Sequence, residues 1–247
     1  MRALFLMSVA AVAIVACATL GSGSSSYPTA EQCPVFAEYD PAALAAAGDP
    51  LQNPQVAAYD TWARARVDEV PVPAEAASAA TRIRVRVPAT GMWRLDDYVT
   101  AWKDNDGRWR IARRRVDYSQ PPPPPPPPPY PTPPDWQPPP QPSMEERFPL
   151  FVGPADAATA ARLDAYLADP CMNAEPTRFG HTLPRRSGPP WVCVPDSSAM
   201  AGEIVEPDRT RLITVRCEND MVTSDFLRFV YGAAGIEEGH VERRTSW

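Results

Sequence analysis

Few side chains in this sequence have the types and spacing that a reaction needs. The chain contains only two histidines, His181 and His240, and either could act as a general base beside a group of polar side chains, Asp196, Ser197 and Ser198. No spacing ties these residues together, and the common nucleophile and metalloprotease motifs do not occur. A surface or hydrogen-bonded histidine is the better expectation. From the sequence we therefore predict no catalytic residue, metal or cofactor. Enzymatic activity stays open, and we favour its absence.

Arginine supplies almost all of the positive charge, because the chain has 23 arginines and a single lysine, Lys103. Six of these arginines form two rows in the sequence. One row is Arg82, Arg84 and Arg86, and the other is Arg113, Arg114 and Arg115. If their strands are neighbours, several of the guanidiniums share one sheet face and could bind phosphate-rich headgroups, lipopolysaccharide or an acidic partner. The alternative, which we favour, is a solvated face partly paired with the acidic segments 18–81 and 143–247, whose net charges are −6 and −5.

The cysteines predict a covalent framework. Besides Cys17 there are four, Cys33, Cys171, Cys193 and Cys217, and an even number suggests two disulfides in an oxidising compartment. Three connectivities are open, and we favour Cys33 with Cys171 and Cys193 with Cys217. Four free thiols are less expected outside the cytoplasm, and a zinc site lacks the usual CxxC or CxxH spacing.

The N-terminus is typical of an export signal. Arg2 precedes an apolar run, Ala3 to Val15, that is too short for a permanent membrane helix of about 20 residues. The following Ile14-Val15-Ala16-Cys17 resembles the lipobox of bacterial lipoproteins. The resemblance implies cleavage after residue 16 and a diacylglycerol on Cys17, with 17–30 as a flexible tether. Ordinary secretion after Ala16-Cys17-Ala18 is the alternative.

The expected location is the cell envelope. The lipoprotein resemblance implies a lipid anchor facing the periplasm, and Ala18 after the lipid cysteine favours the outer membrane in a Gram-negative bacterium. A soluble secreted or periplasmic protein is the alternative. The net charge of −6 and pI near 5.0 argue against a nucleic-acid partner.

Periodicity predicts an α+β fold with helices packed on antiparallel sheets. In the N-terminal half, 31–118, Asp40-Pro41 and Asn53-Pro54 begin helices over 41–47 and 54–68. Strands are expected over 82–87, 92–103 and 108–118, with Asn105-Asp106-Gly107 as a turn.

The end of this half resembles an NTF2-like domain. Residues 50–118 show helices followed by a hairpin with the sequence Trp-Lys-Asp-Asn-Asp-Gly-Arg-Trp at 102–109. The resemblance implies a curved sheet around a cavity, and the catalytic Asp/His pair of that family's enzymes has no counterpart that can be placed here.

A proline-rich segment, 119–142, interrupts the fold. It contains sixteen prolines, nine of them consecutive at 121–129, and embeds Tyr130 and Trp136. Such a segment favours polyproline II or disorder and excludes helix and sheet. A semi-rigid linker or solvated loop is the favoured interpretation, and a docking ligand for an aromatic groove is the alternative.

The C-terminal half, 143–247, is expected to dock on the first half. A helix is predicted over 154–168, followed by short strands at about 190–194, 210–217, 223–231 and 240–246.

Three functions follow as expectations. The first is a membrane-anchored envelope lipoprotein that binds or scaffolds an envelope partner. The second is a small periplasmic enzyme with an NTF2-like cavity. The third is a structural spacer that uses the proline segment to reach across the periplasm.

Overall fold

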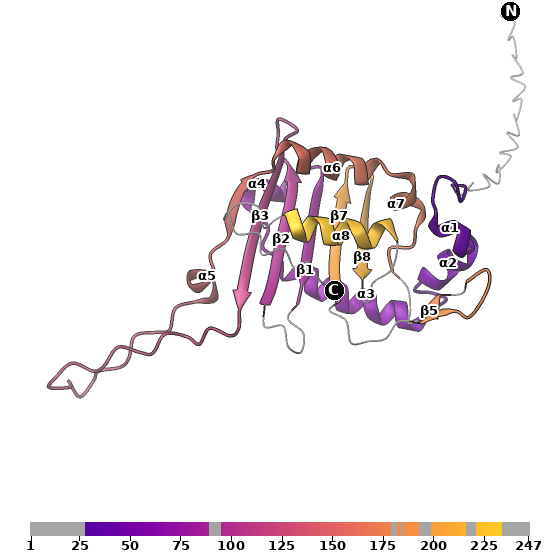
Figure 1. Cartoon of the computed structure of the whole chain (residues 1–247). Coiled ribbons are helices and arrows are strands. Elements are labelled where there is room, and N and C mark those ends of the chain that lie inside the picture. The colour runs from indigo at the N-terminus through magenta and orange to yellow at the C-terminus, as the bar shows by residue number, and fades with distance from the viewer. Residues whose placement is uncertain are drawn as a thin grey trace, which may run out of the picture.

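The computed structural model describes residues 28–88, 95–178, 182–183, 185–192, 199–215 and 221–233. Its centre is a six-stranded antiparallel sheet with the strand order β4-β3-β2-β1-β7-β8 (Figure 1). The strands are β1 Arg82–Val87, β2 Leu95–Lys103, β3 Trp109–Asp117, β4 Phe151–Pro154, β7 Met200–Glu206 and β8 Arg209–Val215. A separate two-stranded ribbon consists of β5 Thr182–Leu183 and β6 Trp191–Val192.

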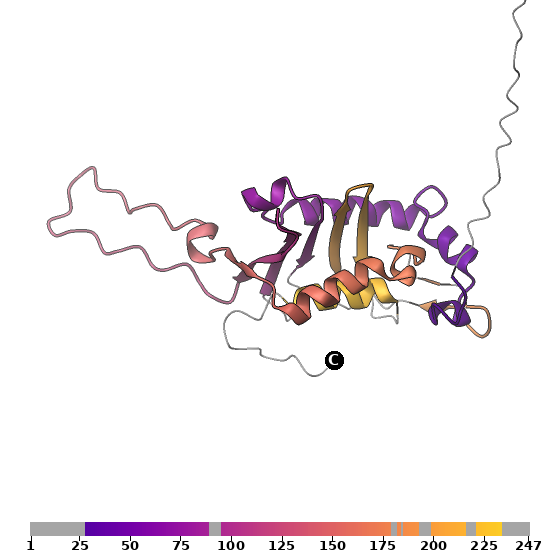
Figure 2. The same ribbon diagram turned by 90° about the horizontal axis from the view of Figure 1, so that it is seen from above.

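Helices cover both faces of the sheet. The helices among the described residues are α1 Val35–Glu38, α2 Pro41–Gly48, α3 Pro54–Asp68, α4 Ala74–Ala77, α5 Met144–Arg147, α6 Ala157–Ala168, α7 Pro170–Ala174 and α8 Val222–Ala233. Seen from above, α3 and α4 lie on one side of the sheet, and α6 and α8 lie on the other (Figure 2). The expected α+β class, with helices on an antiparallel sheet, is confirmed.

Both halves of the chain build the same sheet. β1, β2 and β3 precede the proline-rich segment, while β4 pairs with β3 and β7 pairs with β1. Strands from after the segment therefore flank the first three on both sides. Residues 119–142 connect parts of one sheet and do not separate two bodies.

The main core lies between the sheet and α8. Val85 and Val99 from the sheet and Phe226 and Leu227 from α8 are completely buried in one cluster. A Cβ at Gly202 of β7 would lie 2.5 Å from a methyl carbon of Leu227, so α8 approaches the sheet where no larger side chain fits. A buried leucine or phenylalanine contributes about 1.5–3 kcal/mol relative to an exposed one, so this face supplies much of the stability.

The predicted helix starts are present at Asp40 and Asn53. The Asp40 carboxylate accepts hydrogen bonds from Ala42 N and Ala43 N at 3.0 Å, and the Asn53 amide oxygen accepts one from Gln55 N. Proline at the first helical position needs no hydrogen on its nitrogen. These local rules give α2 and α3 almost the predicted boundaries.

Three predictions for the C-terminal half differ from the structure. The expected strand 223–231 is wrong, because this segment is α8, whose buried Phe226, Leu227 and Val230 follow a helical period. The inner strand β7 was missed, because it has neighbours on both sides and shows no polar alternation. The edge strand β4 was missed because it has only four residues. The expected strand 240–246 lies outside the described residues.

A disulfide closes the sheet end next to β8. Cys33, just before α1, is bonded to Cys171 of α7 across a sequence separation of 138 residues. Phe36, Leu44 and Leu183 are buried around it. We call this region, comprising α1, α2, α7 and the disulfide, the stapled end. The predicted pairing of Cys33 with Cys171 is confirmed, while Cys193 and Cys217 lie outside the described residues.

Candidate functional site: a proline arm and its root

The two arginine rows do not share one face of the sheet. Side chains alternate between faces along a strand, and Arg84 and Arg86 of β1 point toward α3, while Arg113 and Arg115 of β3 point toward α8. By the register across β2, Arg114 lies on the same face as Arg82, Arg84 and Arg86, so several of the six arginines share a face but not all of them.

Most of these arginines are paired inside the molecule. Arg84 binds Glu203 at 2.8 Å, and Arg114 binds Glu145 at 3.0 Å. Arg113 and Arg115 both donate to Asp97, which is 1% exposed. Arg82 donates to the backbone carbonyls of Ala76 and Ala77. Guanidiniums that are already bound to carboxylates and carbonyls do not form an anion-binding surface, so the pairing with acidic segments describes them better.

The remaining member of the row, Arg86, belongs to a buried polar cluster. Arg86 and Asp96 lie 2.7 Å apart, and both are almost completely buried. The Tyr118 hydroxyl also donates to the Asp96 carboxylate at 2.7 Å, and the Arg86 guanidinium lies 3.9 Å from the centre of the Tyr98 ring. Burial and the Asp96 carboxylate raise the pKa of Tyr118. The cluster therefore holds Tyr118, the residue that directly follows β3, in place.

Residues 119–142, which we call the proline arm, begin directly after Tyr118. The arm contains no helix or strand, and every residue is exposed except Trp136, which is half-buried. It leaves the body as two legs that join far from the sheet (Figures 1 and 2). Tyr130, near the tip, is 99% exposed. Polyproline II rises about 3.1 Å per residue, so two legs of about 12 residues would extend about 37 Å.

Polar contacts fix both ends of the arm, and we call these contacts, together with the cluster of Arg86, Asp96 and Tyr118, the arm root. On the outgoing side, the Asp117 carboxylate accepts from Ser119 N and Ser119 Oγ, which lowers its pKa. On the returning side, Ser143 and Glu146 form a capping box on α5. Arg147 then joins the two legs, because its guanidinium donates to the carbonyl of Gln120 at 2.7 Å.

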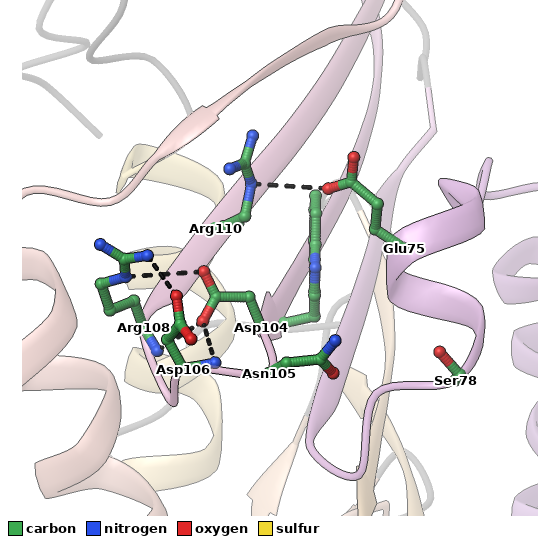
Figure 3. A pocket seen from close by; sticks show the side chains of 8 residues that line it. Glu75, Ser78, Asp104, Asn105, Asp106, Arg108 and Arg110 are labelled. Atoms are coloured by element: carbon green, nitrogen blue, oxygen red, sulfur yellow. Dashed lines mark hydrogen bonds and ion pairs between the residues drawn. The ribbon is translucent and has the colours of Figure 1, made fainter.

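A polar pocket lies at the other end of β3, between α4 and the β2–β3 hairpin (Figure 3). Its volume is about 450 Å³, and its lining residues are Glu75, Ser78, Trp102, Asp104, Asn105, Asp106, Arg108 and Arg110. The Asp104 carboxylate closes the hairpin turn, since it accepts from the backbone N–H groups of Asp106 and Arg108. Arg110 Nε lies 3.8 Å from the Glu75 carboxylate.

A buried carboxyl group lies beside the disulfide. Glu175 follows α7, is 5% exposed, and accepts hydrogen bonds from Thr223 N at 3.1 Å and Thr223 Oγ1 at 3.4 Å in the first turn of α8. Burial raises the pKa of Glu175 to about 7, although the N–H donors of α8 act in the opposite direction. Glu175 thus links the stapled end to the core helix.

Several predicted residues cannot be placed. The lipidation candidate Cys17, both histidines (His181 and His240), and the polar group Asp196, Ser197 and Ser198 lie outside the described residues. Within the described ranges, no group of three or more histidine, cysteine or acidic side chains is placed to hold a metal ion. The same ranges contain no helix that is long and apolar enough to cross a membrane.

Sequence reasoning found the arm but missed its root and the pocket. The arm was visible in composition alone. The root depends on Arg86, Asp96 and Tyr118, which meet only when β1, β2 and β3 pair. The pocket depends on α4, a four-residue helix without a strong sequence signal. Comparisons with protein-family models, with curated proteins and with solved structures found no match for this chain.

Proposed function

We propose that this protein is a lipid-anchored envelope protein that presents its proline arm to a partner with a polyproline-binding groove. The observation that carries the proposal is the placement of the arm. It starts and ends on the β3–β4 side of the sheet, whereas the first described residues and α1 lie on the β8 side (Figure 1).

This placement suits display from a membrane. Five spacings between six strands separate the two sheet edges by about 24 Å. An anchor at Cys17 would enter the domain on the β8 side, so the arm would extend from the side away from that entry point. The disulfide is consistent with an oxidising, extracytoplasmic compartment.

The arm also has the chemistry of a docking ligand. Polyproline II is extended before binding and therefore loses little conformational entropy when it enters an aromatic groove. The fixed root lowers that cost further, because it restricts where the arm can go. Tyr130 offers an exposed aromatic ring near the tip.

The role of a simple spacer fits this geometry less well. A spacer joins two bodies, but both legs of the arm return to neighbouring elements, since β4 pairs with β3. The folded-back path also halves the distance that the segment can reach.

A site-specific crosslinking experiment tests the proposal. A photoreactive phenylalanine analogue at Tyr130 should capture a defined partner in intact cells, and a synthetic 119–142 peptide should compete for that capture. Leu51 is the matched control site, because it is 94% exposed and lies between α2 and α3, outside the arm and its root. The same adduct from both sites, or no competition by the peptide, would contradict docking through the arm.

The anchor is tested separately. Cells grown with labelled palmitate should incorporate label into the wild-type protein and not into Cys17→Ser, which should leave the membrane fraction. Equal labelling of the two proteins would contradict the anchor and leave the test of the arm intact.

A further inference from the structure

The two outer edges of the six-stranded sheet are protected to different degrees. β8 forms one edge, and the chain after α7 covers part of it, since Thr214 N donates to the Thr177 carbonyl at 2.9 Å. Arg209 and Arg211 also place charge on β8, and charged side chains commonly keep an edge strand from pairing with another chain. β4 forms the other edge, and no residue from 148 to 155 carries a charge. The edge at β4 therefore lacks the protection that β8 has.

The backbone of β4 has hydrogen-bonding groups along its outer side. In an antiparallel pair, successive residues turn their N–H and C=O groups alternately toward and away from the neighbouring strand. Ala155 N donates to the Trp109 carbonyl at 2.9 Å. By the β3–β4 register, Phe151 and Gly153 have the same phase as Ala155 and also face β3 with their backbone groups. Val152 therefore directs its N–H and C=O away from β3, and no other strand among the described residues pairs with that side.

Apolar side chains lie next to these outward groups on both faces of the sheet. Phe151 is 51% exposed and Val152 is 42% exposed, and consecutive residues of a strand point to opposite faces. A strand that paired with β4 would cover part of both side chains. An uncharged edge strand with exposed apolar side chains is a template for pairing with another strand.

We propose that β4 is the contact between two copies of this chain, which pair antiparallel about a two-fold axis at Val152. The two Val152 residues then lie opposite each other and exchange both backbone hydrogen bonds. Leu150 N donates to the Pro154 carbonyl of the second copy, so the missing N–H of Pro154 is not needed. Phe151 lies beside Gly153 of the second copy, which has no side chain to obstruct the ring.

The second copy suits this edge because a two-fold contact requires a surface that complements itself. β4 and its flanks carry no charge, so the axis brings no like charges together. Each copy offers both a donor and an acceptor at Val152, and each matches its own Phe151 with the other's Gly153. The contact uses no residue of the proline arm, so the inference does not depend on the function proposed for the arm.

Photocrosslinking between two differently tagged copies in intact cells tests the inference. A photoreactive phenylalanine analogue at Phe151 should yield an adduct that carries both tags. Val192 is the matched control site, because it is 57% exposed and lies in the separate two-stranded ribbon, and it should yield no such adduct. The inference is overturned if Phe151 yields no doubly tagged adduct or if the two sites yield equal amounts.

Two variants of Val152 test whether the strands pair through this residue. Val152→Lys places like charges directly opposite each other in the proposed register and should abolish the doubly tagged adduct. Val152→Thr keeps a β-branched, uncharged side chain and should retain the adduct. Equal amounts of adduct from the two variants would overturn the inference.

Hydrogen exchange of the purified wild-type protein at low and high concentration keeps the test valid if Val152→Lys does not fold. The segment 150–155 should exchange more slowly at the higher concentration, because pairing protects its outward N–H groups. The segment 210–215 of β8 is the internal control and should exchange equally at both concentrations. Concentration-independent exchange of 150–155 would overturn the inference.

Discussion

The stapled end and the arm root attach segments to the same sheet by opposite means. At the stapled end, a disulfide and buried apolar side chains such as Phe36 and Leu44 hold α1 and α2. At the arm root, an ion pair and hydrogen bonds centred on Asp96 hold the start of the proline arm.

The difference follows from what each segment can bury. Residues 33–48 contain aromatic and aliphatic side chains, and the burial of their apolar surface lowers the free energy of the folded state. The proline arm has almost none, so neighbouring polar groups must fix its ends. The attachment at the stapled end should therefore depend on the oxidation of Cys33 and Cys171, and the attachment at the arm root on the charges of Arg86 and Asp96.

The largest expected loss of stability comes from removing the disulfide at the stapled end. Cys33→Ser opens a loop of about 138 residues, and the chain-entropy model gives a loss of about 5 kcal/mol in the free energy of unfolding. Urea denaturation under oxidising conditions measures it. An unchanged midpoint would show that the apolar contacts alone hold α1 and α2.

The arm root should respond strongly to the loss of one charge. Arg86→Met leaves the Asp96 carboxylate buried without its cation, and breaking such a pair costs about 3–4 kcal/mol. Arg108→Met is the matched control, because Arg108 is highly exposed and its ion pairs should contribute less than about 1 kcal/mol. Equal destabilisation of the two variants would remove the distinction between the buried root and the surface.

A smaller and pH-dependent effect is expected at Glu175. Its pKa is about 7 in the folded protein and 4.5 ordinarily, so the folded state holds this proton more tightly than the unfolded chain. The resulting stabilisation is complete below about pH 4.5 and is lost as the pH rises through about 7, by at most about 3 kcal/mol.

Glu175→Gln should flatten this part of the stability curve, as chemical denaturation at a series of pH values would show. Glu31→Gln, at an exposed position, should keep the wild-type slope. A slope that persists in Glu175→Gln would assign the titration to another group.

The sequence predicted those parts of the fold that obey local rules. Asp40 and Asn53 cap their helices, and the alternation over 82–87 marks β1. Cysteine parity and compartment predicted two disulfides with three possible connectivities, and the pairing of Cys33 with Cys171 that we favoured is present. In each case, the signal lies within a few residues or in a simple count.

The remaining features depend on tertiary context. The segment 223–231 is rich in aromatic and β-branched residues, but packing against Gly202 and the sheet makes it a helix. The opposite orientations of Arg86 and Arg115 follow from strand register. The pocket combines a short helix with a hairpin that lies about 25 residues further along the chain, and no local pattern connects them.

The position of the disulfide also decides what a protease can release. The proline arm lies between Cys33 and Cys171 in the chain, so one cut anywhere in it leaves two fragments that are still joined by the sulfur–sulfur bond. The strands from both fragments also remain paired in one sheet. A nicked molecule would therefore stay in one piece, and its damage would become visible only after reduction and unfolding.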